Sequence, residues 1–190
     1  CSQKLTTREE KYFRASGLLP YYSTPAGPCF LVGVEHRKKG GAQLTVLGGK
    51  RELTDGGHPV DTALREFNEE SGFLVDVCPE VDKAVRKAQA AGRLLYTWQR
   101  GAQYFCVLWE PAGGLLRDWP KRFAALTPAQ RTKSGCQMET LHWVPLAALI
   151  TARSGKGPVT DSTGSPLPAK LSYTLSDLVS GGLLDAIGPS

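Results

Sequence analysis

The chain has 190 residues, of which 41% are hydrophobic and 22% are charged, a composition typical of a globular protein with one domain-sized core. No apolar run approaches the roughly 18 residues that a membrane-spanning helix needs, so we expect no membrane partner. The net charge of +5 is compatible with an anionic partner such as a nucleotide or RNA, and equally with a basic protein that binds neither.

Strand-like and helix-like segments interleave along the first half of the chain, which favours a mixed α/β fold. Residues 7–14 have the composition of a short helix. Two further helices are expected over 59–71, between Pro59 and Gly72, and over 80–91, which ends before a glycine. The expected strands, rich in β-branched and aromatic residues, are 26–36, 43–47, 73–77, 94–98 and 102–110.

The second half of the chain is less regular. Residues 112–136 have the composition of a basic loop, and 138–150 of a strand that turns into a helix behind Pro145. A linker rich in Gly, Ser and Pro over 153–168 leads to an amphipathic helix near 174–186. We therefore expect residues 1–152 to form the main domain, and 153–190 to form a linker and a C-terminal helix packed on it. Contact of that helix with a partner or a second copy is the alternative, and the oligomeric state stays open.

Cysteine usage bears on the compartment. The five cysteines form no C-x-x-C pair, and the N-terminus shows no secretory leader. A reducing, intracellular location follows as an expectation: the cytoplasm, or an organelle if a leader before Cys1 was removed.

Three glutamates occur within five positions of the helix expected over 59–71. Glu66, Glu69 and Glu70 share one arc of that helix, because offsets of three and four bring side chains together. Like charges this close repel, and a hard divalent cation such as Mg²⁺ or Mn²⁺, which prefers carboxylate oxygens, would relieve the repulsion. Arg65 is four positions from Glu69 and is placed to orient a carboxylate. A solvated acidic helix face is the competing interpretation.

The segment 48–73 resembles the Nudix box, the loop–helix–loop signature of Nudix (MutT-like) hydrolases. Residues 65–73, REFNEESGF, follow the R-E-U-x-E-E-x-G-U half of that pattern, with Phe as the bulky apolar residue U. Gly48-Gly49-Lys50 is similar to its usual GGK start. A weaker resemblance extends over residues 13–150, through ASGLLPYYST and LHWVPLAAL. The resemblance implies an α/β fold in which a mixed β-sheet is sandwiched between α-helices.

The loop before the helix departs from the Nudix pattern by being two residues longer. Counting back from Arg65, Gly57 occupies the position of the box's first glutamate; counting forward from Gly49, Asp55 occupies it. That early carboxylate is therefore either supplied by Asp55 or missing. His58, in the same loop, is either a phosphate contact or a surface residue without a role.

The resemblance implies a metal-dependent pyrophosphohydrolase that cleaves a phosphoanhydride bond in a nucleoside-diphosphate-linked substrate, whether nucleotide, nucleotide derivative or capped RNA. A catalytically weak or inactive Nudix-fold binding or scaffold subunit, for instance in an RNA–protein assembly, is the alternative. An unrelated α/β domain with a fortuitous acidic helix is a third. The resemblance assigns Glu66, Glu69 and Arg65 to catalysis, with Glu66 or a neighbouring loop carboxylate as general base. It assigns Glu66, Glu69 and Glu70 to the binding of Mg²⁺ or Mn²⁺. Gly49, Lys50 and Glu139 are expected to contact the substrate.

The segment 117–133 interleaves five cations with Trp119 and Phe123. Aromatic side chains stack on bases and cations hold phosphates, which favours a nucleotide tail or RNA at this segment. A solvated loop with buried aromatics is the alternative. The cations are Arg117, Lys121, Arg122, Arg131 and Lys133.

Overall fold

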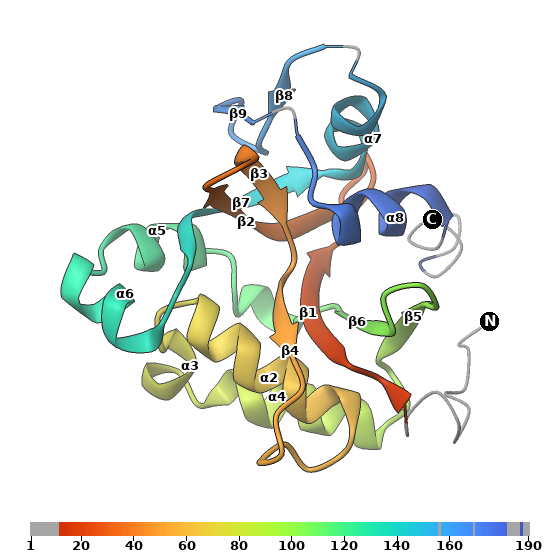
Figure 1. Ribbon diagram of the computed structural model, residues 1–190, viewed down its shortest axis with the longest axis vertical. Helices are drawn as coiled ribbons and strands as arrows, with labels where there is room; N and C mark the ends of the chain where they lie inside the picture. Colours follow the sequence, from red (N-terminus) through yellow and green to blue (C-terminus); the bar gives the residue numbers. More distant parts are fainter. Residues whose placement is uncertain (1–11, 156, 169, 182–186, 188–190) are drawn as a thin grey trace.

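The computed structural model describes residues 12–155, 157–168, 170–181 and 187. In this part the chain is an α/β protein built on a seven-stranded mixed sheet with helices packed on both sides (Figure 1). The central order is β3-β2-β1-β6-β5, with β4 paired to β1 and β7 paired to β2. Strands β1 and β6 are parallel, and the other pairs of the sheet are antiparallel.

The strands are β1 (Ala15–Tyr22), β2 (Cys29–Arg37), β3 (Gly41–Thr45), β4 (Leu47–Lys50), β5 (Leu95–Gln99), β6 (Tyr104–Trp109), β7 (Met138–Pro145), β8 (Val159–Thr160) and β9 (Pro166–Leu167). The helices are α2 (Pro59–Glu70), α3 (Leu74–Val77), α4 (Glu80–Ala90), α5 (Trp119–Ala124), α6 (Pro128–Ser134), α7 (Leu146–Ser154) and α8 (Tyr173–Gly181), with a 3-10 turn at Ala112–Gly114. None of the helices in the described ranges is long and apolar enough to cross a membrane.

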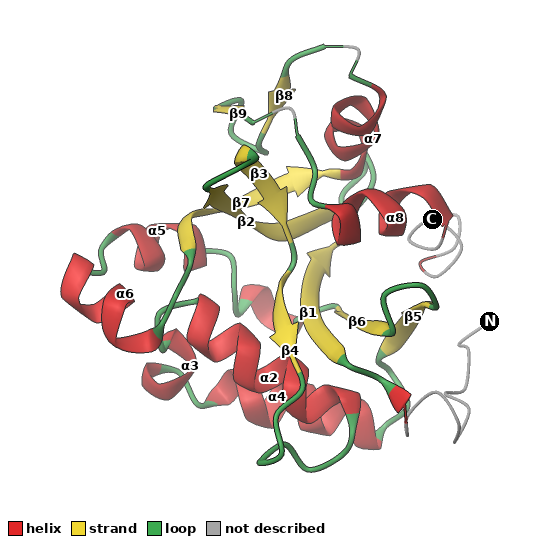
Figure 2. Ribbon diagram, in the orientation of Figure 1, coloured by secondary structure: helices red, strands yellow, loops and turns green. Residues whose placement is uncertain are grey.

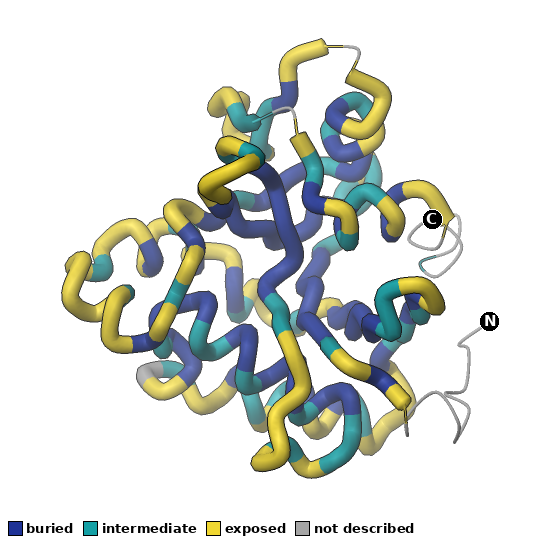
Figure 3. Tube along the Cα trace, viewed as in Figure 1, coloured by how far each residue is buried: buried dark blue, intermediate teal, exposed yellow. Residues whose placement is uncertain are grey.

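The sheet separates two apolar layers, because successive side chains of a strand point to opposite faces. Leu18 of β1 and Val107 of β6 belong to the layer that contains α2 and α4, whereas Leu19 and Leu108 belong to the layer that contains α7 and α8. Apolar side chains therefore cover both faces of the central strands, and Figure 3 shows these strands buried along most of their length. This arrangement explains why the β6 sequence is a continuous apolar run and not an alternating one.

Strand β1 changes partners along its length. Its first half, from Ala15 to Leu18, pairs with β4, whereas at Tyr21 and Tyr22 it pairs with β2. Pro20, which has no backbone N–H to donate, lies between the two pairings. The predicted strand over 43–47 is likewise divided, because β3 ends before Val46 and β4 begins after it. Strands β2 and β4 therefore pair with different parts of β1, and the sheet divides between them.

Helix α2 confirms the helix predicted over 59–71. Pro59 occupies the first turn, and the His58 ring nitrogen Nδ1 accepts a hydrogen bond from the Val60 N–H at 3.1 Å, which caps the helix. At the other end Gly72 adopts a left-handed φ of 70°, the conformation that lets the chain leave a helix without strain. His58 is therefore a capping residue, a role that the sequence interpretation missed.

The prediction of a strand over 73–77 is wrong, because this segment forms the short helix α3. The Asn68 side-chain oxygen accepts a hydrogen bond from the Val75 N–H at 3.1 Å, and Leu74 and Val75 are buried in the same apolar layer as α2. The β-branched composition of the segment favoured a strand, but this tertiary environment overrides it.

The prediction of a loop over 112–136 is also wrong, since Figure 2 shows two helices there, α5 and α6. Thr127 and Gln130 form a capping box at the start of α6. Trp119 and Phe123 are fully buried, and the Trp119 ring stacks on Phe67 with centroids 5.2 Å apart. These two aromatics belong to the core and are not free to stack on a nucleic-acid base.

The expected elements over 80–91, 94–98, 102–110 and 138–150 are confirmed as α4, β5, β6 and the β7–α7 pair, within a few residues at each end. Residues Leu175, Leu178 and Val179 of α8 are buried in the layer that contains α7. Residues 7–11 of the expected helix over 7–14 and the end of the expected helix over 174–186 lie outside the described residues, and Phe13 and Arg14 are not helical.

Candidate functional site

Arg65 of α2 organises a group of acidic side chains. Its Nε and Nη2 donate to the two carboxylate oxygens of Asp55 at 2.8 and 3.2 Å, a forked pair. Nη2 also donates to the backbone oxygen of Lys50 at 2.7 Å. The guanidinium thus ties the end of β4 and the following loop to the helix.

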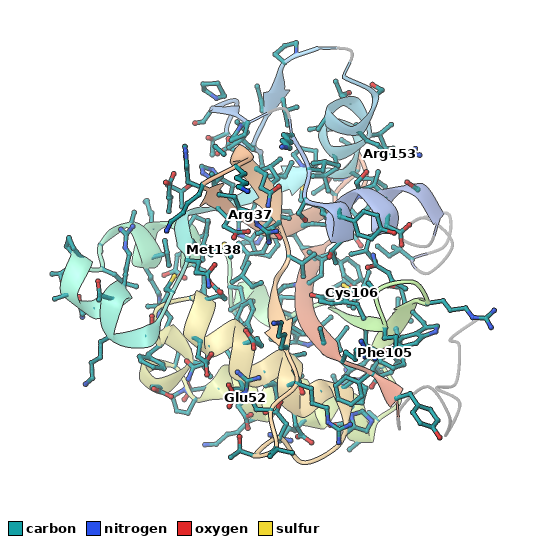
Figure 4. All side chains as sticks on the ribbon, viewed as in Figure 1. Arg37, Glu52, Phe105, Cys106, Met138 and Arg153 are labelled. Atoms are coloured by element: carbon teal, nitrogen blue, oxygen red, sulfur yellow. The ribbon has the colours of Figure 1, made fainter. Side chains whose placement is uncertain are left out.

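Asp55 is the carboxylate that the lengthened loop delivers to this site. Figure 4 shows Glu52 of this loop below β4, and Figure 3 shows that the loop is largely exposed. The Asp55 side chain, in contrast, is only 3% exposed. It also accepts hydrogen bonds from Thr62 Oγ1 at 2.7 Å and from the Glu52 N–H at 2.9 Å. Burial raises the pKa of Asp55, but the bonds from Arg65, Glu52 and Thr62 outweigh it and hold the pKa at about 2. Gly57, the other position considered, is a turn residue with φ of 87°.

Glu66 and Glu69 share one nitrogen of Arg65. Arg65 Nη1 lies 2.9 Å from Glu66 Oε1 and 3.2 Å from Glu69 Oε2. The Glu66 side chain is 11% exposed and that of Glu69 is 37% exposed, so Glu66 faces the protein and Glu69 faces solvent. Burial raises the pKa of Glu66, and the neighbouring Arg65 lowers it only in part.

Glu70 is the most strongly perturbed carboxylate of the group. It is buried, and its Oε2 accepts a hydrogen bond from the Gln137 N–H at 2.9 Å, which links α2 to the segment before β7. Burial is the main cause that raises the pKa of Glu70 to about 7; the Gln137 N–H lowers it, and the charges of Glu66, Glu35 and Glu69 raise it further. The carboxylates of Glu66, Glu35 and Glu69 are therefore close enough to repel that of Glu70.

Glu35 of β2 is the member of this group that the sequence analysis missed. It is 7% exposed, and it accepts hydrogen bonds from Arg37 Nε at 2.9 Å and from Gln43 Nε2 at 3.4 Å. Its signal in the sequence was an acidic residue that ends the apolar run CFLVGV. Residues that follow such a run are usually exposed, and only the pairing of β2 in three dimensions shows that this one faces Glu70.

The remaining residues expected to contact substrate lie around this group. Gly49 lies directly against the Glu66 carboxylate, and the exposed Lys50 contributes its backbone oxygen to Arg65. The Glu139 carboxylate instead lies 3.8 Å from His36 Nδ1 and is half-exposed, at a bulge where β7 carries one extra residue opposite β2. The structure thus brings together Arg65, Glu66, Glu69, Glu70 and Gly49, while the side chain of Glu139 pairs elsewhere.

Gly48 and Gly49 allow two different close approaches, and we predict different costs for filling them. A Cβ on Gly48 would lie 2.5 Å from the Gly17 Cα and 2.7 Å from the Ser16 oxygen, both backbone atoms that cannot move away. The three atoms nearest a Cβ on Gly49 would all belong to the Glu66 carboxylate, the end of a flexible side chain. Urea denaturation should show that Gly48→Ala lowers the free energy of unfolding by about 3 kcal/mol and Gly49→Ala by about 1 kcal/mol. Equal losses would contradict this assignment of contacts.

The charge distribution defines what the group can bind. Among the residues described, no three His, Cys, Asp or Glu side chains already surround a common point in the way that a preformed metal site would. Nevertheless, Glu66, Glu70 and Glu35 are buried, and burial together with the like charges nearby keeps the pKa of Glu70 elevated. Such a group favours the approach of a cation, and Glu66, Glu69 and Glu70 are the side chains whose oxygens could hold one.

Comparison with known proteins adds no assignment, since the chain matches neither a model of a known protein family nor a curated protein.

Proposed function

We propose that the chain is a Mg²⁺- or Mn²⁺-dependent hydrolase of the Nudix type, which cleaves a phosphoanhydride bond in a nucleoside-diphosphate-linked substrate. The observation that carries the proposal is the group of mutually repelling carboxylates on α2, which Arg65 and Asp55 hold in place at a cost to the fold. A mixed sheet between two helical layers is compatible with the Nudix fold that the segment 48–73 resembles.

The donor set fits a hard divalent cation. Carboxylate oxygens are the ligands that Mg²⁺ and Mn²⁺ prefer, and Glu66, Glu69 and Glu70 supply them from three neighbouring positions of one helix. The raised pKa values of Glu66 and Glu70 mean that the unliganded site holds negative charge unfavourably. When bound, the cation would neutralise the charge of a diphosphate and polarise the phosphorus–oxygen bond that breaks.

The side chains divide the remaining tasks. Burial raises the pKa of Glu66 and so makes it a stronger base than an ordinary carboxylate, which suits it to accept the proton of an attacking water. Arg65 orients Glu66 and Glu69 through Nη1, and Asp55 orients Arg65. Lys50, exposed beside Gly49, is placed to contact a phosphate.

A binding or scaffold protein without turnover is the second candidate, and one contact favours it. Arg65 Nη1 lies within 3.2 Å of both Glu66 and Glu69, so a guanidinium already neutralises two of the three carboxylates that would hold the cation. In a scaffold the same contacts would serve only to fix the loop on the helix.

A screen for phosphate and pyrophosphate release separates the two candidates. Nucleoside triphosphates, dinucleoside polyphosphates, nucleotide sugars and capped RNA would be incubated with the protein and Mg²⁺ or Mn²⁺, with and without EDTA. A hydrolase would release product from at least one class in a metal-dependent manner. If none of the four classes is cleaved while Mg²⁺ leaves the melting temperature unchanged, the hydrolase proposal is rejected and the scaffold remains.

A further inference from the structure

A second candidate site lies at the opposite end of β1 from Gly49. It is a cavity of about 210 Å³ lined by Tyr22, Ser23, Glu110, Leu116, Arg117 and Trp143, among others. Gly49 pairs with Ser16, six residues before Tyr22, so the cavity is separated from the carboxylate group by about 20 Å of strand. The function proposed for α2 therefore makes no use of it.

The wall of the cavity is aromatic. The Tyr22 and Trp143 rings meet edge to face with centroids 4.7 Å apart, beside the fully buried Leu116. The Arg117 guanidinium lies over the Tyr22 ring, 4.9 Å from its centroid. Flat apolar surface together with a planar cation is the surface on which a heteroaromatic ring stacks.

The residues that line the cavity also include a hydrogen-bond acceptor, Glu110, and a hydrogen-bond donor, Trp143. Glu110 Oε1 accepts from the Ser23 N–H at 3.2 Å and from Ser23 Oγ at 3.0 Å, which fixes the carboxylate and leaves Oε2 outside both bonds. The Trp143 indole nitrogen is buried and has no hydrogen-bond partner among the described residues. Five other buried side-chain atoms of the described residues share this state, so the indole N–H supports the argument through its residue's place in the cavity wall and not by its rarity.

We propose that this cavity binds a guanine base. Guanine carries two adjacent N–H donors, N1 and N2, either of which can donate to Oε2 of Glu110, the oxygen that Ser23 does not use. Its O6 and N7 acceptors match an arginine fork, here Arg117. Adenine presents an acceptor at N1 where guanine has a donor, so a carboxylate repels that edge. The size supports a single base, because cavities for larger ligands start at about 300 Å³.

Two sources supply this chemistry, a free guanine nucleotide and an unpaired guanosine in RNA. Both present the same base, and they differ only in the phosphates and neighbouring nucleotides. The inference does not rest on hydrolase activity, so the cavity can bind guanine even if the carboxylate group on α2 proves inactive, and the reverse holds as well.

Calorimetric titration of the full chain with GMP and AMP, in EDTA so that metal binding plays no part, tests the proposal. We expect GMP to bind at least about 10-fold more tightly than AMP, and Glu110→Gln to remove about 10-fold of the GMP affinity, because the charged acceptor of the guanine N–H is lost. Glu80→Gln, the same change at an exposed position on α4, is the matched control and should leave binding unchanged. The indole N–H resonance of Trp143 should shift with GMP.

Titration with the oligonucleotide UUUGUUU, with UUUAUUU as the control that lacks guanine, distinguishes RNA from a free nucleotide as the source of the base. Tighter binding of UUUGUUU than of GMP, again sensitive to Glu110→Gln, would identify RNA as the source of the base; equal binding would identify the free nucleotide. The proposal is overturned if GMP does not bind at about 1 mM, if AMP binds as well as GMP, or if Glu110→Gln, with an unchanged melting temperature, binds GMP as wild type does.

Discussion

Substitution of Glu70 by glutamine is expected to abolish metal-dependent turnover and, at the same time, to stabilise the metal-free protein. The pKa of Glu70 is raised to about 7, above the ordinary value of 4.5, so the folded protein holds the proton more tightly than the unfolded chain. The stability loss from this carboxylate therefore grows as the pH rises from about 4.5 to 7 and is complete above it. At pH 8, Glu70→Gln should raise the free energy of unfolding by about 2 kcal/mol.

The loss of turnover should be at least about 100-fold, because the charge of one ligand oxygen disappears from a site that stabilises the transition state by several kcal/mol. Thermal unfolding with and without Mg²⁺ gives an independent readout: Mg²⁺ should raise the melting temperature of the wild type and not that of the variant. Glu80→Gln serves as the control for both measurements. Undiminished product release by Glu70→Gln, or equal stabilisation by Mg²⁺, would remove Glu70 from the site.

Substitution of Asp55 by asparagine is expected to destabilise the fold strongly. The Asp55 side chain is almost fully buried and forms a forked pair with Arg65, and Asp55→Asn removes the charge that faces Nε and Nη2 of the guanidinium. We expect the free energy of unfolding at pH 7 to fall by about 3 kcal/mol in urea or guanidinium denaturation. The control is Asp82→Asn, which breaks the exposed pair with Arg86 on α4 and should cost less than about 1 kcal/mol.

The pH dependence of this difference follows from the pKa of Asp55, which is lowered from 3.8 to about 2. A lowered carboxyl pKa gives stability that is fully present above pH 3.8 and that is lost as the pH falls through 2. The gap between wild type and Asp55→Asn should therefore be constant from pH 7 to about 5 and should close between about pH 4 and 2. A gap that persists unchanged at pH 2 would mean that the carboxylate charge is not what Arg65 requires.

The sequence predicted the parts of the fold that depend on local pattern. Helix α2 was predicted with both ends, because a proline, a glycine and an apolar stripe of period 3.6 all lie within fifteen residues. The segment 73–77 was predicted wrongly, because what holds it as a helix is the side chain of Asn68 and the surrounding core. Helices α5 and α6 were missed although the capping box of Thr127 and Gln130 was present, because a high density of basic residues was interpreted as solvation.

The residues of the candidate site likewise divide into those that a local sequence pattern predicts and those that depend on the tertiary structure. Arg65, Glu66, Glu69 and Glu70 could be found from spacing, since they share one helix. Asp55 was one of two alternatives, and only the path of its loop decides between them. Glu35 was not found, because its proximity to Glu70 depends on the pairing of β2 with β7 and on the packing of α2 against the sheet, neither of which a local pattern contains.

The change of partner at Pro20 has a mechanical consequence. Glu66 lies against Gly49 of β4, on one half of the sheet, whereas Glu70 accepts a hydrogen bond from the segment before β7, on the half that contains β2 and Glu35. Helix α2 therefore crosses the place where β1 changes partner. A cation held by Glu66 and Glu70 together would tie the two halves of the sheet to each other and stiffen the junction between them.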